Sequence, residues 1–229
     1  MWARITEYLP ELLPAALRTV ILTFVSMAFA TVIGAVMAAL GYSRSRIVRL
    51  ATRVYVETSR NTPELVQIYL WFFVLPAVGI VLSPAVAGVI ALSWAFGAYL
   101  TEVVRGGIEA VDTTQWEAAK VLGMPRRLTW RRVILPQAAR NVLPVWASYF
   151  VSMFKATAFL SVITVPELLY VTHEIASINF RYFELFALAG ILYFLMGYPS
   201  LLVFERLERR WGKATRGEEH AQVQPMASV

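Results

Sequence analysis

Three ionisable side chains, Glu64, Glu102 and Lys155, stand in otherwise apolar stretches of the sequence. A charge at the centre of a bilayer costs roughly 2.5–3.5 kcal/mol, so such residues need an oppositely charged partner or a watery cavity. Carboxylate and ammonium groups in this setting can bind a charged solute, or they can act as acid and base in a membrane enzyme. No Ser/His/Asp, Cys/His or metal-ligand constellation accompanies them, which favours solute binding over catalysis. A channel is a third hypothesis, but it requires the chain to oligomerise.

The depth of these groups suggests how they pair. Lys155 lies about twelve residues, or roughly 18 Å, beyond the start of an apolar stretch at Leu143, and Glu64 lies at comparable depth. A Glu64–Lys155 ion pair could fix helix packing, or the two could line a path for solute, or Lys155 could snorkel. Glu102 and Arg105 are one helical turn apart, which favours a local ion pair over solute contact. The residues that we expect to line a polar path are Arg60, Asn61, Glu64, Gln67, Tyr99, Glu102, Lys155 and Thr157.

The elements that position these groups are membrane-spanning helices. Apolar residues make up 58% of the chain and charged residues 16%, against about 25% charged residues in a typical soluble domain. An apolar stretch of about 20 residues crosses the hydrocarbon core as a helix. The sequence therefore predicts an all-α integral membrane protein with about five transmembrane helices, at Val20–Leu40, Leu65–Leu82, Ala85–Val104, Leu143–Val165 and Leu185–Phe204.

The first two of these predicted helices have unusual flanking or internal residues. The first is longer than the apolar region of a signal peptide and follows Glu7 and Glu11, so we expect it to be retained. The second has a polar first half; we expect it to start near Tyr55 and to be kinked or opened at Pro63.

The distribution of positive charge predicts the orientation. Sixteen of the 21 Lys and Arg residues follow the first, third or fifth helix, and with five spans these regions share one side of the membrane. The positive-inside rule then places the N-terminus outside and the C-terminus in the cytoplasm. Because the net charge of +6 is explained by topology, we expect no nucleic-acid partner.

A polar insert, Gln115–Pro144, separates the third and fourth helices on the cytoplasmic side. Thr114 and Glu117 match a capping box that starts a helix, while Gly123 and Pro125 are typical of a helix end. The resulting two turns are too short to be stable alone in water.

A helix this short must pack against a partner protein or the membrane surface to be stable. Trp116 and Leu122 offer apolar anchors for the groove of a partner protein. The alternative is an amphipathic helix that lies on the membrane, with the neighbouring arginines only enforcing the topology.

Five blocks of sequence, in order, resemble a known family. QWEAAKVLG followed by VILPQAARNVLP is similar to the EAA motif of bacterial ABC importer permeases. The other blocks are SRNTPELVQIY, GAYLTEVVRGGI, KATAFLSVITVPELL and the terminal ERLERRW. Together they resemble the polar amino acid permeases of the histidine/glutamine type, over residues 15 to 211.

The resemblance implies an ATP-driven importer of polar or charged amino acids or related derivatives in the bacterial inner membrane. A separate pair of ATPase subunits would bind ATP and Mg, so no cofactor is expected on this chain, which also lacks a phosphate-binding loop. A second permease subunit, identical or homologous, would complete the pathway as a dimer, and an outside solute-binding protein would deliver the solute. The residues that would form the coupling helix, seated in a cleft of the ATPase, are Trp116, Glu117, Ala118, Ala119, Leu122 and Gly123.

Composition and the resemblance together divide the chain into three parts. Residues 1–14 would be an outer interfacial segment, and residues 15–211 the transmembrane permease domain, with its coupling region at 112–136. Residues 212–229 would be a polar cytoplasmic tail without regular structure.

Two departures from the family pattern affect the solute. Lys155-Ala156-Thr157-Ala158-Phe159 stands where the family has Lys-Asp-Thr-Ser-Leu, so a carboxylate that could meet a cationic group is missing. Arg60-Asn61-Thr62-Pro63-Glu64-Leu65 replaces Arg-Gly-Thr-Pro-Leu-Leu, which makes Glu64 the candidate replacement for that carboxylate. We therefore expect intact coupling machinery and altered solute specificity.

Overall fold

The computed structural model describes the backbone of residues 7–222, and within that range all regular structure is helical. Nine α-helices are joined by short turns and by π-helical (η2, η4) and 3-10 (η3, η5) segments. In chain order the elements are α1 (Leu9–Gly41), α2 (Arg46–Arg60), α3 (Glu64–Tyr69), η2 (Leu70–Val74), η3 (Leu75–Val78), α4 (Pro84–Glu109), α5 (Thr113–Val121), α6 (Arg126–Thr129), η4 (Trp130–Ile134), α7 (Leu135–Ala156), η5 (Thr157–Ile163), α8 (Leu168–Asn179) and α9 (Tyr182–Gln222).

Four helical stretches in this part of the chain are long and apolar enough to cross a membrane. They are Leu9–Gly41, Pro84–Glu109, Arg126–Ile163 and Tyr182–Phe204. The prediction of an all-α membrane protein is thus confirmed.

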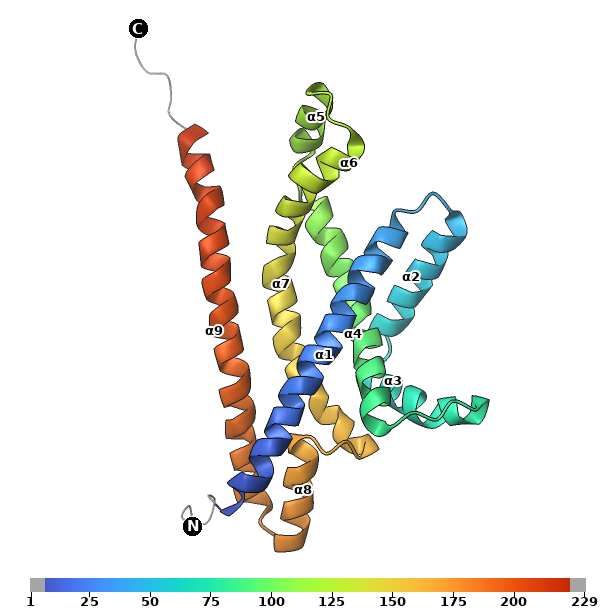
Figure 1. Ribbon diagram of the computed structural model, residues 1–229, viewed down its shortest axis with the longest axis vertical. Coiled ribbons are helices and arrows are strands. Elements are labelled where there is room, and N and C mark those ends of the chain that lie inside the picture. The colour runs from blue at the N-terminus through green and yellow to red at the C-terminus, as the bar shows by residue number, and fades with distance from the viewer. Residues whose placement is uncertain (1–6, 223–229) are drawn as a thin grey trace.

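The second predicted span is not one continuous helix. The chain leaves α2 through Asn61 and Pro63, and the extended backbone of Pro63 (φ −54°, ψ 140°) separates α2 from α3. Proline has no N–H to donate and restricts the residue before it, which explains the break. Figure 1 shows α2 returning antiparallel to α1, and the short helices from α3 onward turning aside from it.

The core is centred on α4, which packs mainly against α1 and then against α7. One face of α4 buries the small side chains of Ala87, Ala91, Ala95 and Ala98. Small residues let two helix backbones approach closely, which is how membrane helices gain packing contacts. Larger buried side chains fill the remaining space: Leu92 from α4 itself, and Met27, Phe150 and Met153 from α1 and α7.

The two ends of the molecule differ in character. Figure 1 shows α5 and α6 at the same end as the α1–α2 turn, and α8 together with the start of α1 at the opposite end. The arginines that follow the first predicted span and those that follow the third therefore lie at the same end of the molecule. At that end α9 continues as helix through Gln222, so the expectation of an irregular tail from residue 212 is corrected over residues 212–222.

At the α8 end a buried carboxylate joins three helices. Glu167 is fully buried and caps α8, accepting hydrogen bonds from the backbone N–H groups of Leu169 (2.9 Å) and Tyr170 (2.7 Å). The Tyr193 hydroxyl of α9 donates to the same carboxylate at 2.7 Å, and Thr19 of α1 accepts from the Leu168 N–H at 3.1 Å. Burial raises the pKa of Glu167 above its ordinary value, although these hydrogen bonds oppose the shift.

Candidate functional site

The predicted coupling helix is present as α5, but it starts differently from the expectation. Asp112 is the N-cap residue, and its Oδ1 accepts a hydrogen bond from the Thr114 N–H at 2.8 Å. Thr114 lies inside the first turn, so the predicted Thr114–Glu117 capping box is wrong. The bond from the Thr114 N–H lowers the pKa of Asp112, because it favours the ionised carboxylate.

The end of α5 is as predicted. Gly123 has φ +67°, in the left-handed region that favours glycine. The Gly123 N–H donates to the Lys120 carbonyl and the Met124 N–H to the Ala119 carbonyl, each at 3.0 Å. These two bonds form a Schellman motif, which satisfies the last carbonyl groups of the helix.

Two of the six predicted coupling residues face the protein. Ala119 is buried, and the Trp116 ring packs edge-on against Trp130 with centroids 5.1 Å apart. Trp116 therefore anchors α5 to its own chain, instead of lying open as an anchor for a partner's groove.

The other face of α5 is open. Glu117 and Ala118 are exposed, and Val121 and Leu122 expose 87% and 77% of their surface. Val121 was absent from the sequence-based set. Val121 and Leu122 thus form a small exposed apolar surface at the end of α5.

The ends of α4 and α7 that flank α5 are held tightly together. Asn141 Nδ2 of α7 donates to the Gly107 carbonyl of α4 at 3.2 Å. A Cβ added at Gly107 would lie 2.4 Å from Val142 Cγ2, so only glycine allows this approach. Gln137 of α7 also reaches Gln115 of α5 at 3.3 Å. α5 therefore contacts α7, and the ends of α7 and α4 are fixed to each other beside it.

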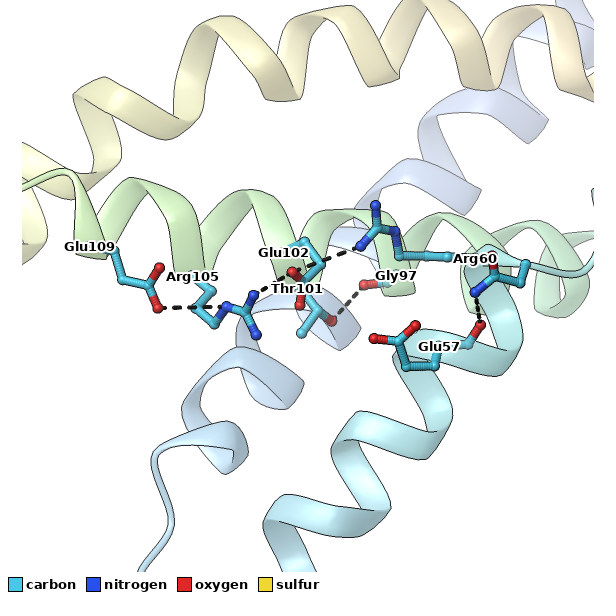
Figure 2. Close-up of polar contacts among 8 residues, drawn as sticks. Glu57, Arg60, Gly97, Thr101, Glu102, Arg105 and Glu109 are labelled. Atoms are coloured by element: carbon cyan, nitrogen blue, oxygen red, sulfur yellow. Dashed lines mark hydrogen bonds and ion pairs between the residues drawn. The ribbon is translucent and has the colours of Figure 1, made fainter.

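A row of alternating charges runs along the same end of α4. Arg105 Nη2 lies 2.7 Å from Glu102 Oε2, and Arg105 Nε lies 3.6 Å from Glu109 Oε1. Figure 2 shows Arg60, from the end of α2, reaching the Glu102 carboxylate, at 3.8 Å. The predicted local Glu102–Arg105 pair is confirmed, and the Arg60 contact joins it to a second helix.

Tyr99 continues this cluster one turn away. Its hydroxyl oxygen lies 3.4 Å from both Glu64 Oε1 and the Arg60 carbonyl oxygen, so its single proton is donated to one or the other. The Arg60 guanidinium lies 5.9 Å from its ring centroid. Tyr149 of α7 stacks on Tyr99 at 5.4 Å. Four predicted residues, Arg60, Glu64, Tyr99 and Glu102, are thus brought together. Tyr149 was missed, because an aromatic residue in a membrane helix gives no sequence signal beyond packing.

The other predicted residues of the polar path lie elsewhere or have structural contacts. Gln67 is buried and its Nε2 donates to the carbonyls of Ser59 and Thr62 at 2.9 Å each, which clamps the α2–α3 break. Asn61 Nδ2 bonds the Glu57 carbonyl at 2.7 Å and closes the end of α2. Thr157 is buried and donates to the Phe154 carbonyl at 2.6 Å.

Lys155 corrects the expected ion pair. It is exposed and lines a groove of about 270 Å³ beside Tyr193 and Tyr198 of α9. Among the described residues no carboxylate lies within 4.0 Å of it, so the Glu64–Lys155 pair is not formed in this structure.

The part of the chain that the structure describes is a bundle of helices long and apolar enough to cross a membrane, with α5 at one end and a charged cluster on α4, an arrangement compatible with a membrane transport protein. The sequence model of the family described as "Binding-protein-dependent transport system inner membrane component" matches residues 30–213, and the chain belongs to this family. It is therefore a membrane-spanning permease subunit of an ABC importer and not itself an enzyme, and the hypotheses of an acid–base enzyme and of a channel are not supported.

Individual relatives agree with this assignment. The chain is 38% identical over 188 residues to a probable amino-acid ABC transporter permease protein of Sinorhizobium fredii, covering 82% of this chain and 81% of the relative. It is 36% identical over 193 residues to the L-cystine transport system permease protein of Bacillus subtilis, with 84% and 82% covered. It is 34% identical to that organism's probable glutamine ABC transporter permease protein over 210 residues, with 89% and 95% covered.

Solved structures agree as well. An amino acid ABC transporter crystallised with histidines contains a chain that superposes with a TM-score of 0.87 at 34% identity, covering 92% of this chain and 98% of that one. A methionine ABC transporter in inward-facing conformations superposes with a TM-score of 0.75 at 17% identity, covering 89% and 97%, and supports the fold alone.

Proposed function

We propose that this permease subunit imports polar or charged amino acids or related derivatives, and that the cluster around Tyr99 contacts the solute. The relatives named for amino-acid transport support this class of solute. The observation that carries the proposal is that α4 bears both the charged cluster and, at Gly107, the contact with Asn141 of α7 that ties together the two helices flanking α5. Tyr99 and Gly107 are separated by about 12 Å along one helix.

The chemistry of the cluster suits a zwitterion. A guanidinium binds a carboxylate through paired hydrogen bonds, and the carboxylates of Glu64 and Glu102 can accept from an ammonium group. The faces of Tyr99 and Tyr149 provide a surface for cations. Arg60 and Glu102 keep 42% and 24% of their side-chain surface exposed, so both groups remain accessible. Lys155, which lies outside this cluster, stays a candidate pathway residue on another face.

Coupling would work through the exposed face of α5. Glu117, Val121 and Leu122 would sit in a groove of a separate ATPase subunit, while Trp116 and Ala119 hold α5 to its own chain. Closure of an ATP-bound ATPase pair would displace α5, and the Asn141–Gly107 contact would carry that movement into α4 and α7. The energetic requirement is that ATP favours one of two membrane conformations over the other.

The proposed assembly has two permease subunits, two ATPase subunits and a solute-binding protein on the outside. The end that carries α5, together with the arginines that follow the first and third predicted spans, would face the cytoplasm, with the N-terminus outside. The positive-inside rule supports this orientation.

Reconstitution with the co-purified ATPase and the cognate binding protein tests the proposal. ATP hydrolysis should be stimulated by a subset of a panel of basic, acidic, polar and opine-like amino acids. Failure of every amino acid to stimulate, with an active ATPase present, would contradict the proposed solute class. Mutation of Arg60 to Gln should weaken the response to the preferred solute, and an unchanged response would contradict the assigned cluster.

A further inference from the structure

Helix α2 presents three different faces. Its packing face is buried and contains Thr52, Tyr55, Val56 and Ser59. A second face is apolar but open, because Ile47, Leu50 and Val54 expose 80%, 60% and 52% of their surface. The third face carries the side chains of Arg46, Arg49, Arg53 and Glu57. A cationic stripe therefore runs directly beside an exposed apolar stripe on one helix.

The cationic stripe lines a cavity. The space between the end of α1, α2 and α4 has a volume of about 430 Å³ and is lined by charged groups that include Arg46, Arg49, Arg53, Glu57, Glu102 and Arg105. Four arginines against two glutamates leave two positive charges in excess. Figure 2 shows Glu102 engaged by Arg105 on α4, with Glu57 nearby on α2.

Among the described residues, no carboxylate forms an ion pair with Arg46, Arg49 or Arg53. Arg49 Nη1 is held by backbone carbonyls, those of Ser43 at 2.8 Å and Arg44 at 3.1 Å. Within the described residues, Arg46 and Arg53 have no carboxylate oxygen within 4.0 Å. Grouped guanidinium ions with unsatisfied donors are a site for a phosphate or a similar anion.

The cavity lies at the end of a membrane-spanning helix, and this position indicates which kind of anion it can bind. Gly41 and Tyr42 line it where the apolar helix α1 ends, and interfacial tyrosines sit at headgroup level. Leu50 lines the cavity and also belongs to the open apolar face. An amphiphile with an anionic headgroup would place its phosphate among the arginines and its acyl chains along Ile47, Leu50 and Val54.

We propose that this cavity binds the phosphodiester headgroup of an anionic phospholipid, and that the apolar face of α2 holds the acyl chains. Arg46 and Arg53 bind the phosphate directly, and Arg49, fixed by its backbone contacts, closes one side of the cavity. Basic pockets between membrane helices at the cytoplasmic surface are suited to such headgroups. The cavity shares Glu102 with the proposed solute site, but the two arginines assigned to the phosphate, Arg46 and Arg53, belong to neither the Tyr99 cluster nor α5.

Native mass spectrometry of the assembled, delipidated transporter tests the proposal. Phosphatidylglycerol and phosphatidylcholine with the same acyl chains are added back, and the lipids retained per complex are counted. The wild type should retain phosphatidylglycerol in preference to phosphatidylcholine. The double variant Arg46→Gln/Arg53→Gln should bind phosphatidylglycerol about tenfold more weakly, because each arginine contributes separately to anionic lipid binding. The matched control Arg44→Gln/Arg206→Gln, which removes two exposed arginines outside the cavity, should bind like the wild type.

Four results would overturn the proposal. Equal retention of the two lipids shows that the headgroup charge is not recognised, and unchanged binding in Arg46→Gln/Arg53→Gln shows that the cavity is not the site. Displacement of phosphatidylglycerol by millimolar inorganic phosphate shows a free-phosphate site without a role for the acyl chains. If the Gln variant fails to assemble, Arg46→Lys/Arg53→Lys is tested in its place. This variant keeps the positive charge and should still prefer phosphatidylglycerol. Loss of that preference in an assembled complex would contradict the proposal.

Discussion

Asn141 of α7 donates a hydrogen bond to the Gly107 carbonyl of α4 at 3.2 Å, and this contact ties together the two helices that enter and leave the docking segment. The two helices approach closely here, because a Cβ at Gly107 would lie 2.4 Å from Val142 Cγ2 and 3.1 Å from the Ala138 carbonyl oxygen. In the proposed coupling mechanism, this contact carries a displacement of α5 to the charged cluster on α4.

Replacing Gly107 by Ala should loosen this joint. Overpacking of this kind costs about 1–3 kcal/mol, so the assembled transporter should lose heat stability and its coupled uptake should fall. Gly106→Ala is the matched control, since nothing lies within 4 Å of a Cβ there. It should be neutral or should stabilise the helix by roughly 0.5–1 kcal/mol. Thermal inactivation and uptake of the two variants, measured side by side, check this; equal behaviour would refute the tight joint.

The left-handed backbone of Gly123 gives a second prediction. An L-residue in this conformation costs about 1–2 kcal/mol, but Asn tolerates it better than Ala. Gly123→Ala should therefore reduce the fraction of ATPase that co-purifies with the permease, and Gly123→Asn should reduce it less. The added side chain meets no neighbour within 4 Å, so a loss of the same size in both variants would show that the backbone conformation is not the cause.

Glu102 is the centre of the charged row, and its loss should affect solute recognition more than stability. Glu102→Gln removes the charge that meets Arg105 and Arg60, both at least 42% exposed, and exposed pairs contribute only about 0–1 kcal/mol. Solute-stimulated ATP hydrolysis should fall while the melting temperature barely moves. Glu109→Gln, at the 61% exposed end of the row, serves as the control. Equal effects of the two variants on stimulation would remove Glu102 from the site.

Glu167 predicts a pH dependence of stability at the α8 end. Its pKa is raised by burial above the ordinary value of 4.5. The stabilisation that it contributes is therefore complete below the unfolded-state pKa and is lost as the pH rises through the higher folded-state pKa. The wild type should lose stability relative to Glu167→Gln as the pH rises through that window.

The Gln variant offers one acceptor oxygen in place of two, so it should be less stable than the wild type at low pH while lacking this pH dependence. Thermal unfolding across mildly acidic to neutral pH measures the effect. Glu174→Gln, an exposed residue on α8, should follow the wild-type curve, and a Glu167→Gln curve parallel to the wild type would contradict the assignment.

The sequence was most informative where a local signal decides the structure. Gly123 and Pro125 placed the end of α5 correctly, because a left-handed glycine followed by proline stops a helix whatever surrounds it. The start of α5 was misplaced by two residues because Asp112 and Thr114 are both good capping residues, and the sequence does not say which one the backbone will use.

Long-range relationships were predicted less well. Glu64 and Lys155 were expected to pair because they lie at similar depths in the membrane. Depth does not determine which way a helix face points, and Glu64 contacts Tyr99, whereas Lys155 lies beside α9. Trp116 was expected to face a partner, yet its neighbour is Trp130, on a segment whose packing no local pattern reveals. The second span was expected to be kinked or opened at Pro63, and the structure shows the second of these alternatives, with α2 and α3 separated at this residue.

The most direct test of the central claim measures ATP hydrolysis by the reconstituted transporter with and without the solute-loaded binding protein, for the wild type and for Gly123→Arg. The claim is that α5 transmits between the ATPase and the membrane helices. The wild type should be stimulated, whereas Gly123→Arg should keep its membrane fold and lose the stimulation. Normal stimulation of Gly123→Arg would contradict the account.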